Sequence, residues 1–164
     1  MTLVADDTLL VEPGADGVVA TASYSSLRLW PSALAALGWA TARSRRVSGY
    51  SDTRRLAPPA SGFRFRSRPL MLTQLYVLGP ASGDGVTIGP VSRRDAVVKL
   101  VKHAYALDID DRRKVIGHFE RLYRHRCVLS IRRLLFPRGF AHLAAVRDVI
   151  RRDLRLTDRA AGDW

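Results

Sequence analysis

Apolar residues recur every three or four positions over much of the second half of the chain, which is typical of helices that bury one face. Ser92 and Asp95 resemble a capping box and predict that a helix begins there. A second helix is predicted to open near Asp110, and a third follows the break at Pro137-Arg-Gly139. We therefore expect the C-terminal half to be mostly helical.

Short apolar runs bounded by turn-forming residues predict β-strands elsewhere. Residues 8–11 and 17–21 flank a turn-rich stretch and read as a hairpin with a five-residue connection. The nearly continuous apolar run at 70–78 is typical of a central strand covered on both faces, and 86–88 is expected to pair with it. A further strand is expected at 128–136. Together the elements predict an α/β fold with a mixed β-sheet and C-terminal helices.

The segment from residue 41 to residue 69 is the least regular part of the pattern. It follows a short predicted helix that Pro31 begins and Gly38 ends. Arginine, serine and proline dominate the segment, and no periodic apolar face is visible in it. We expect an exposed, arginine- and proline-rich loop of unusual length inside a single domain that spans residues 1–164.

Charge and composition favour a folded domain without a membrane partner. The chain has a net charge of +12, and its hydrophobic content of 47% is that of a folded domain. No apolar run approaches the roughly 20 residues of a membrane span, so no membrane partner is expected. The single cysteine, Cys127, cannot form an internal disulfide, which favours the cytoplasm. The arginines occur as scattered pairs, which favours a solvated basic surface over one polyanion-binding stripe.

The acidic pair Asp6-Asp7 is the sharpest chemical feature. It follows the short apolar run Leu3-Val-Ala5, which we expect to be a strand. A carboxylate after a strand can hold Mg²⁺ or take the proton of an attacking hydroxyl. A polar turn after the strand would have the same pattern. The basic stretch Arg64-Phe-Arg-Ser-Arg68 could likewise contact phosphates or form only a strand edge.

Other familiar motifs are not present in the sequence. A phosphate-binding loop needs a lysine followed by Ser or Thr after a glycine-rich stretch. None of the three lysines fits: Lys99 precedes Leu100, Lys102 precedes His103, and Lys114 precedes Val115. His118 and His125 lie seven residues apart without a nearby acidic ligand, which favours structural or exposed histidines over a metal site.

Several sequence segments resemble the HPr kinase/phosphorylase-like serine kinase family, and they occur in the family's order. The sequence Leu3-Val-Ala-Asp-Asp7 is similar to the family's strand that ends in Ala-Asp-Asp. The stretch from Ser23 to Gly38, the run from Arg68 to Leu78, the His103 end of the first long helix, and the last strand with its Pro137 helix resemble later parts of the family. The resemblance covers most of the chain.

The resemblance implies a P-loop-kinase fold that lacks its N-terminal strand, phosphate loop and helix. It implies that Asp6 and Asp7 are the catalytic acids and the Mg²⁺ ligands, and that Arg28, Arg54 and Arg55 lie near the ATP. The acceptor would be a serine of a protein or peptide.

The family places a phosphate loop before the Ala-Asp-Asp strand, whereas this chain begins almost on that strand. We therefore expect a fragment or an inactive form of an ATP-dependent serine kinase, and no activity from the isolated chain. Without the phosphate loop, ATP binding by this chain alone is also doubtful. A second copy of the chain is a candidate partner. The alternative is a non-catalytic module that recognises a peptide or polyanion through the 41–69 segment; direct nucleic-acid binding ranks third.

Overall fold

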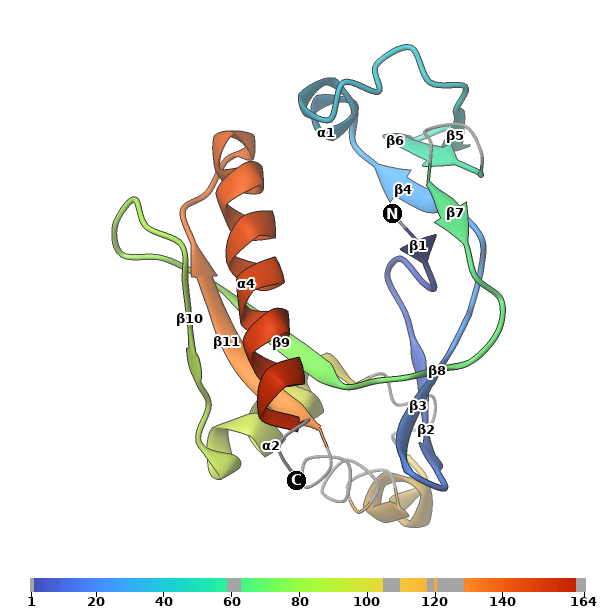
Figure 1. Cartoon of the computed structure of the whole chain (residues 1–164). Coiled ribbons are helices and arrows are strands. Elements are labelled where there is room, and N and C mark those ends of the chain that lie inside the picture. Colours follow the sequence, from blue (N-terminus) through green and yellow to red (C-terminus); the bar gives the residue numbers. More distant parts are fainter. Residues whose placement is uncertain (1, 59–62, 105–109, 118–119, 121–128, 162–164) are drawn as a thin grey trace. The chain divides into compact units, whose positions relative to one another are not determined.

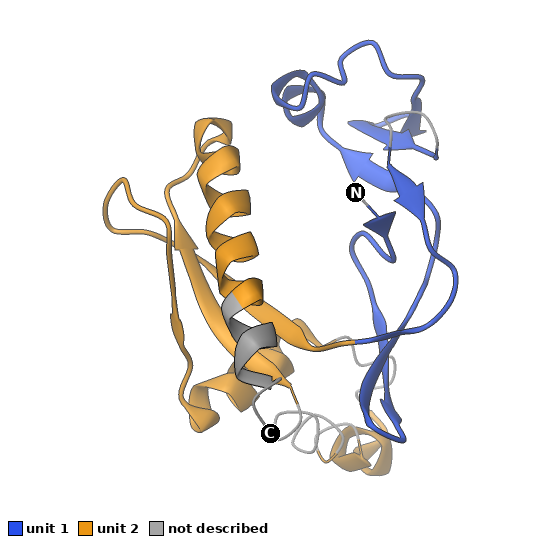
Figure 2. Cartoon of the chain, viewed as in Figure 1, with its two compact units in different colours: residues 1–71 blue, residues 72–164 orange. Residues whose placement is uncertain are grey.

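The computed structural model describes residues 2–58, 63–104, 110–117, 120 and 129–161, and it describes side chains as far as residue 155. The chain divides into two compact units, Met1–Met71 and Leu72–Trp164 (Figure 2). The described residues form four β-sheets and several helices, which makes the chain a mixed α/β protein with helices toward its C-terminal end (Figure 1). This part of the predicted fold class is confirmed.

The first sheet of unit 1 contains the predicted hairpin. Its strand order is β2-β3-β8, with β2 at Leu10–Gly14, β3 at Gly17–Thr21 and β8 at Leu70–Met71. The connection is shorter than expected because Pro13 joins the strand and pairs with Val18. Proline is tolerated there because β2 lies at the edge of this sheet. The backbone N–H groups on the outer side of an edge strand form no hydrogen bonds to a neighbouring strand, so a missing N–H costs little.

Two further sheets of unit 1 surround its hydrophobic core. One has the order β4-β6-β5, and the other is the parallel pair β1-β7. Their bounds are β1 Thr2–Leu3, β4 Leu27–Leu29, β5 Arg45–Ser48, β6 Ser51–Leu56 and β7 Arg64–Phe65. The core consists of four buried side chains, Leu27, Leu34, Leu56 and Phe63. Leu34 comes from helix α1 (Pro31–Ala36), which Pro31 begins and Gly38, at φ +70°, follows as predicted.

The prediction of a loop over residues 41–69 is wrong for much of that segment. It contains β5, β6 and β7, and it supplies both Leu56 and Phe63 to the core. One face of a sheet can face solvent, so a few widely spaced apolar residues are enough to anchor it while the arginines occupy the outer positions. This sparse pattern produces no periodic apolar signal.

The sheet of unit 2 has the order β10-β11-β9, with β9 at Gln74–Pro80, β10 at Thr87–Pro90 and β11 at Ser130–Phe136. The apolar run at 70–78 is therefore not one central strand. It divides at Leu72-Thr73 between β8 of unit 1 and β9 of unit 2. Strand β10 pairs with β11 rather than with the 70–78 run, and β11 is the middle strand.

The helices of unit 2 largely follow the sequence pattern. Helix α2 (Arg93–His103) begins as predicted at Ser92, whose hydroxyl accepts the backbone N–H of Asp95 at 3.1 Å. Residues 112–117 are helical, and Asp111 rather than Asp110 accepts the N–H groups at their start. The 3₁₀ turn η1 (Phe140–His142) and helix α4 (Leu143–Ala161) complete the unit.

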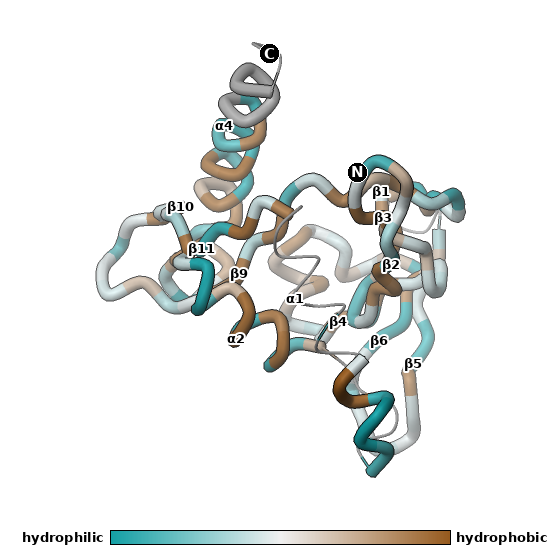
Figure 3. Tube along the Cα trace, turned by 90° about the horizontal axis from the view of Figure 1, so that it is seen from below, coloured by the Kyte–Doolittle hydropathy of each residue, from teal (hydrophilic) through white to brown (hydrophobic). Residues whose placement is uncertain are grey.

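Helix α4 lies along the sheet of unit 2, and hydrophilic and hydrophobic residues alternate along it (Figures 1 and 3). Predictions for Leu107, His118, His125, Cys127 and Val128 concern residues outside the described ranges. Among the described helices, none combines the length and the apolar character needed to cross a bilayer.

Candidate functional site

Arg28 connects the two carboxylates of the acidic pair. The backbone N–H of Arg28 donates to Asp6 Oδ2 at 2.7 Å, and its guanidinium forms an ion pair with Asp7 Oδ2. The guanidinium also donates to the Tyr24 hydroxyl and lies over the Tyr24 ring, with Cζ 5.3 Å from the ring centroid. The Tyr24 hydroxyl is in turn 3.5 Å from Asp7 Oδ2. Four residues from two chain segments thus form one polar cluster.

The backbone around β1 explains where the acidic pair lies. Strand β1 ends at Leu3, whose carbonyl accepts the N–H of Arg66 at 2.9 Å, and its partner β7 is only two residues long. The chain therefore leaves the sheet before Asp6 and bends at Asp6 and Asp7. The expected strand over residues 3–5 is shorter than predicted. The carboxylates lie in the bend after β1 and face β4 through Arg28.

The ion pair between Arg28 and Asp7 is accessible to solvent. The side chains of Arg28 and Asp7 are 34% and 56% exposed. The pKa of Arg28 is raised above its ordinary value, first by the hydrogen bond to Tyr24 and then by the negative charges of Asp7 and Asp6. Exposed ion pairs of this kind contribute little to stability because water and salt screen them. The cluster can consequently open without a large loss of stability.

A row of arginines extends from Arg28 across the β4-β6-β5 sheet. Figure 1 shows the three strands of this sheet. Arg28 is directly opposite Arg55, and Arg55 is directly opposite Arg45. Directly opposite residues place their side chains on the same face of a sheet, so these three form what we call the sheet arginine row. Like charges in such a row destabilise the sheet unless an anion lies between them.

Arg54 does not join the row. It is opposite Leu29 and Arg46, and successive residues of a strand point to opposite faces. On its face, Arg46 pairs with Asp52 at 2.5 Å. Of the basic residues expected near the nucleotide, Arg28 and Arg55 therefore share one face of this sheet and Arg54 lies on the other.

Sequence reasoning missed two members of this arrangement, Tyr24 and Arg45. Tyr24 lies four residues before Arg28, outside any regular element, so no periodicity marks it. Arg45 enters the row only through the register of β5 against β6, which includes an irregularity after Arg46. Nothing in the sequence alone therefore marks Tyr24 or Arg45 as part of this arrangement.

The acidic pair offers the type of oxygen ligand that Mg²⁺ prefers. Protein sites for Mg²⁺ often supply only one or two carboxylates, and substrate phosphates complete the coordination. Asp6 and Asp7 fit that requirement, and no group of three His, Cys, Asp or Glu side chains that could hold a metal occurs among the described residues.

Comparisons of the chain with protein-family models, with curated proteins and with solved structures each found no match. The resemblance to HPr-kinase-like enzymes therefore stays a prediction from the sequence.

Proposed function

We propose that unit 1 carries the acidic part of a phosphoryl-transfer site of the HPr-kinase-like serine kinase type. The observation that carries the proposal is that Arg28, the first member of the sheet arginine row, contacts both Asp6 and Asp7. Carboxylates that receive a hydroxyl proton or a metal ion and cations that meet phosphate are the parts that phosphoryl transfer requires. The order along the chain of the segments that resemble HPr-kinase-like enzymes supports the same class of protein.

In this proposal Asp6 is the positioned carboxylate. Its oxygen is held by the backbone N–H of Arg28, and a carboxylate fixed in this way can orient the hydroxyl of an acceptor serine and accept its proton. Asp7 is the more exposed carboxylate and is the residue that would meet a metal ion. Bound Mg²⁺ would neutralise phosphate charge.

Arg28 acts as the counter-ion of the pair in the absence of ligand. Its guanidinium neutralises Asp7 and can turn toward a phosphate oxygen, because an exposed ion pair is weak. Arg55 follows on the same face and can neutralise a second anionic group. The substrate class is ATP together with a serine-bearing protein or peptide.

The 164-residue chain alone is expected to show ATP turnover no higher than background, because no lysine follows the phosphate-loop pattern. The roles of the two acids are tested by joining the strand, glycine-rich loop and helix of an HPr-kinase-like enzyme ahead of Thr2. The proposal predicts Mg²⁺-dependent ATP binding by this fusion, measured by calorimetry, which Asp6→Asn or Asp7→Asn weakens.

Asp52→Asn is the matched control, because Asp52 is another exposed carboxylate of unit 1 that pairs with an arginine. ATP binding that is equally strong in the Asp6, Asp7 and Asp52 variants would contradict the assignment. Strong turnover by the unmodified chain would show that a phosphate loop is dispensable.

A second candidate function is a non-catalytic module that binds an anionic peptide. The specific observation in its favour is the sheet arginine row, in which three like charges face one another across three strands. Arg45→Ala combined with Arg55→Ala should then abolish binding of a phosphoserine peptide, and Asp7→Asn should strengthen it by removing a competing anion. If Asp7→Asn weakens binding instead, the peptide-binding alternative is excluded.

A further inference from the structure

Asp153 fixes the rotation of helix α4 against the sheet of unit 2. It is 7% exposed, its Oδ2 accepts the Tyr76 hydroxyl of β9 at 2.7 Å, and its Oδ1 forms an ion pair with Arg132 of β11. Tyr76 and Arg132 are directly opposite each other in the sheet. The partly buried residues of the same helix face are Val146, Val149, Ile150 and Leu154. Because this face packs inward, the opposite face of α4 is solvent-exposed.

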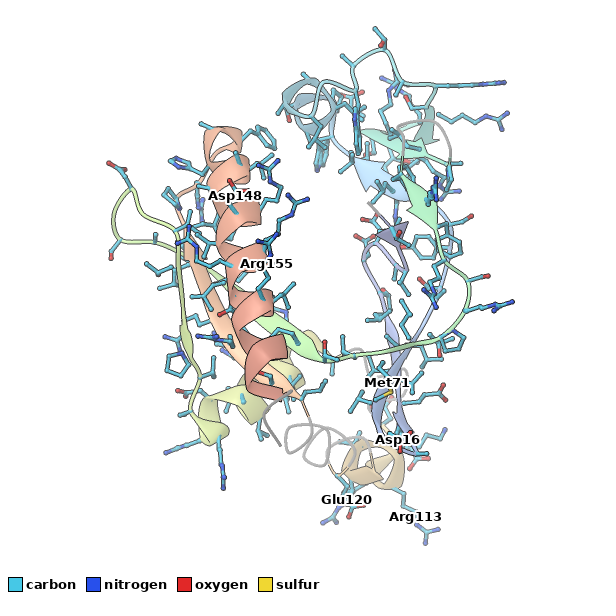
Figure 4. The ribbon with its side chains drawn as sticks, viewed as in Figure 1. Asp16, Met71, Arg113, Glu120, Asp148 and Arg155 are labelled. Atoms are coloured by element: carbon cyan, nitrogen blue, oxygen red, sulfur yellow. The ribbon has the colours of Figure 1, made fainter. Side chains whose placement is uncertain are left out.

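The exposed face carries four arginines, which we call the α4 arginine face. Arg147, Arg151 and Arg155 follow one another at intervals of four residues, so they form one row along the helix, and Arg152 lies beside them. The rise between successive members is about 6 Å. Figure 4 shows the side chains of Asp148 and Arg155 extending from α4. All four arginine side chains are exposed.

The positive charge of this face is only partly compensated. Asp148 is the one exposed acidic side chain described on α4, and it contacts Arg147 Nε at 2.9 Å. Its pKa is lowered first by the hydrogen bond from Arg147 and then by the charges of Arg147, Arg151 and Arg152. Like charges four residues apart on a helix repel one another and destabilise it. A bound polyanion would remove this cost.

The side chains of α4 also restrict the kind of polyanion. Proteins that hold single strands combine basic residues with aromatic platforms for the bases, and α4 contains no aromatic residue. It also contains no Asn or Gln, which commonly read base edges. Its apolar face packs in unit 2 and is not available for insertion into a membrane surface. Arginine forks match the paired oxygens of phosphates.

We propose that the α4 arginine face binds the phosphate backbone of double-stranded nucleic acid without sequence preference. The row presents guanidinium groups at regular intervals to a ligand whose charges are also regularly spaced, and phosphate contacts alone are sufficient for non-specific binding. This inference concerns unit 2 and does not depend on the phosphoryl-transfer proposal for unit 1.

The test is a salt titration of binding to a labelled DNA duplex of random sequence, followed by fluorescence anisotropy. Each phosphate contact contributes about 0.9 to the slope of log K against log salt concentration. Arg151→Ala with Arg155→Ala should therefore reduce that slope by about two units. Alanine is well tolerated at exposed helical positions, and circular dichroism checks that the variant is folded.

Arg93→Ala with Arg94→Ala is the matched control, because it removes the same charge from exposed positions of α2 in the same unit. The proposal predicts that this control changes the slope by less than half as much. It is overturned if both double variants change the slope equally, if the wild-type chain does not bind the duplex, or if single-stranded DNA, anionic vesicles or an acidic polypeptide bind as tightly as the duplex.

Discussion

At the scale of single residues, the two acids of the pair differ in how the fold uses them. Asp6 accepts a backbone N–H in a partly buried position, whereas Asp7 pairs through an exposed side chain. Removing a charged acceptor from a buried donor costs more than removing an exposed ion pair. The two adjacent carboxylates should therefore respond differently to substitution.

We predict that Asp6→Ala lowers the free energy of unfolding by about 1.5 kcal/mol, since it leaves the Arg28 N–H without its acceptor. Asp7→Asn should lower it by less than about 1 kcal/mol. Urea denaturation measures both, with Asp16→Ala, an exposed turn residue, as the control. If Asp7→Asn costs more than Asp6→Ala, the structural roles of the two residues are reversed.

Tyr76 gives a pH-dependent prediction. Burial, and then the hydrogen bond to Asp153, raise the pKa of Tyr76 from 10.0 to about 12. The folded chain thus holds the phenolic proton more tightly than the unfolded chain does. This contribution to stability is present below pH 10.0 and is lost as the pH rises toward about 12. Between these values the free energy of unfolding should fall with rising pH.

Tyr76→Phe should remove most of this pH dependence and should cost about 1 kcal/mol of stability at neutral pH through the lost hydrogen bond. Tyr50→Phe is the control, because the Tyr50 side chain is 96% exposed. Measuring the free energy of unfolding at a series of alkaline pH values distinguishes Tyr76→Phe from Tyr50→Phe. An unchanged pH dependence in Tyr76→Phe would exclude Tyr76 as its source.

At the scale of elements, β6 tests whether residues 41–69 belong to the folded core. Leu56 at its end is 0% exposed. Leu56→Ala should therefore destabilise unit 1 by about 3 kcal/mol, as expected when a buried leucine is shortened. Leu10→Ala, at a position that is 54% exposed in β2, should cost less than about 0.5 kcal/mol. Equal effects of the two changes would mean that β6 does not anchor the core.

The sequence predicted elements whose determinants are local. Ser92 caps α2 and Pro31 begins α1, since each signal acts within one turn of its own helix. The division of the 70–78 run between two units and the strands of 41–69 were not predicted. Both depend on which distant strand pairs with which, and a short apolar run carries no information about its partner.

At the scale of the whole molecule, the charge pattern and the candidate site also depend on contacts between distant residues, which the sequence does not reveal. The pair Asp6-Asp7 stands out in the sequence, but its contact with Arg28 depends on a fold that joins positions 22 residues apart. The arginines look scattered in the sequence because they occur singly or as short pairs along most of the chain. Strand register gathers some of them into the sheet arginine row, and helical spacing gathers others on α4.

The most direct test of the central claim asks whether Asp6 and Asp7 form a divalent-metal site. Mn²⁺ is added to the isotopically labelled chain as a paramagnetic substitute for Mg²⁺, and the broadening of backbone amide signals is measured by NMR. We predict that the amides of Asp6, Asp7 and Arg28 broaden first. Asp6→Asn combined with Asp7→Asn should remove this effect, and Asp52→Asn should leave it unchanged. Broadening that is as strong around Asp52 as around Asp7, or that persists in the double variant, would contradict it.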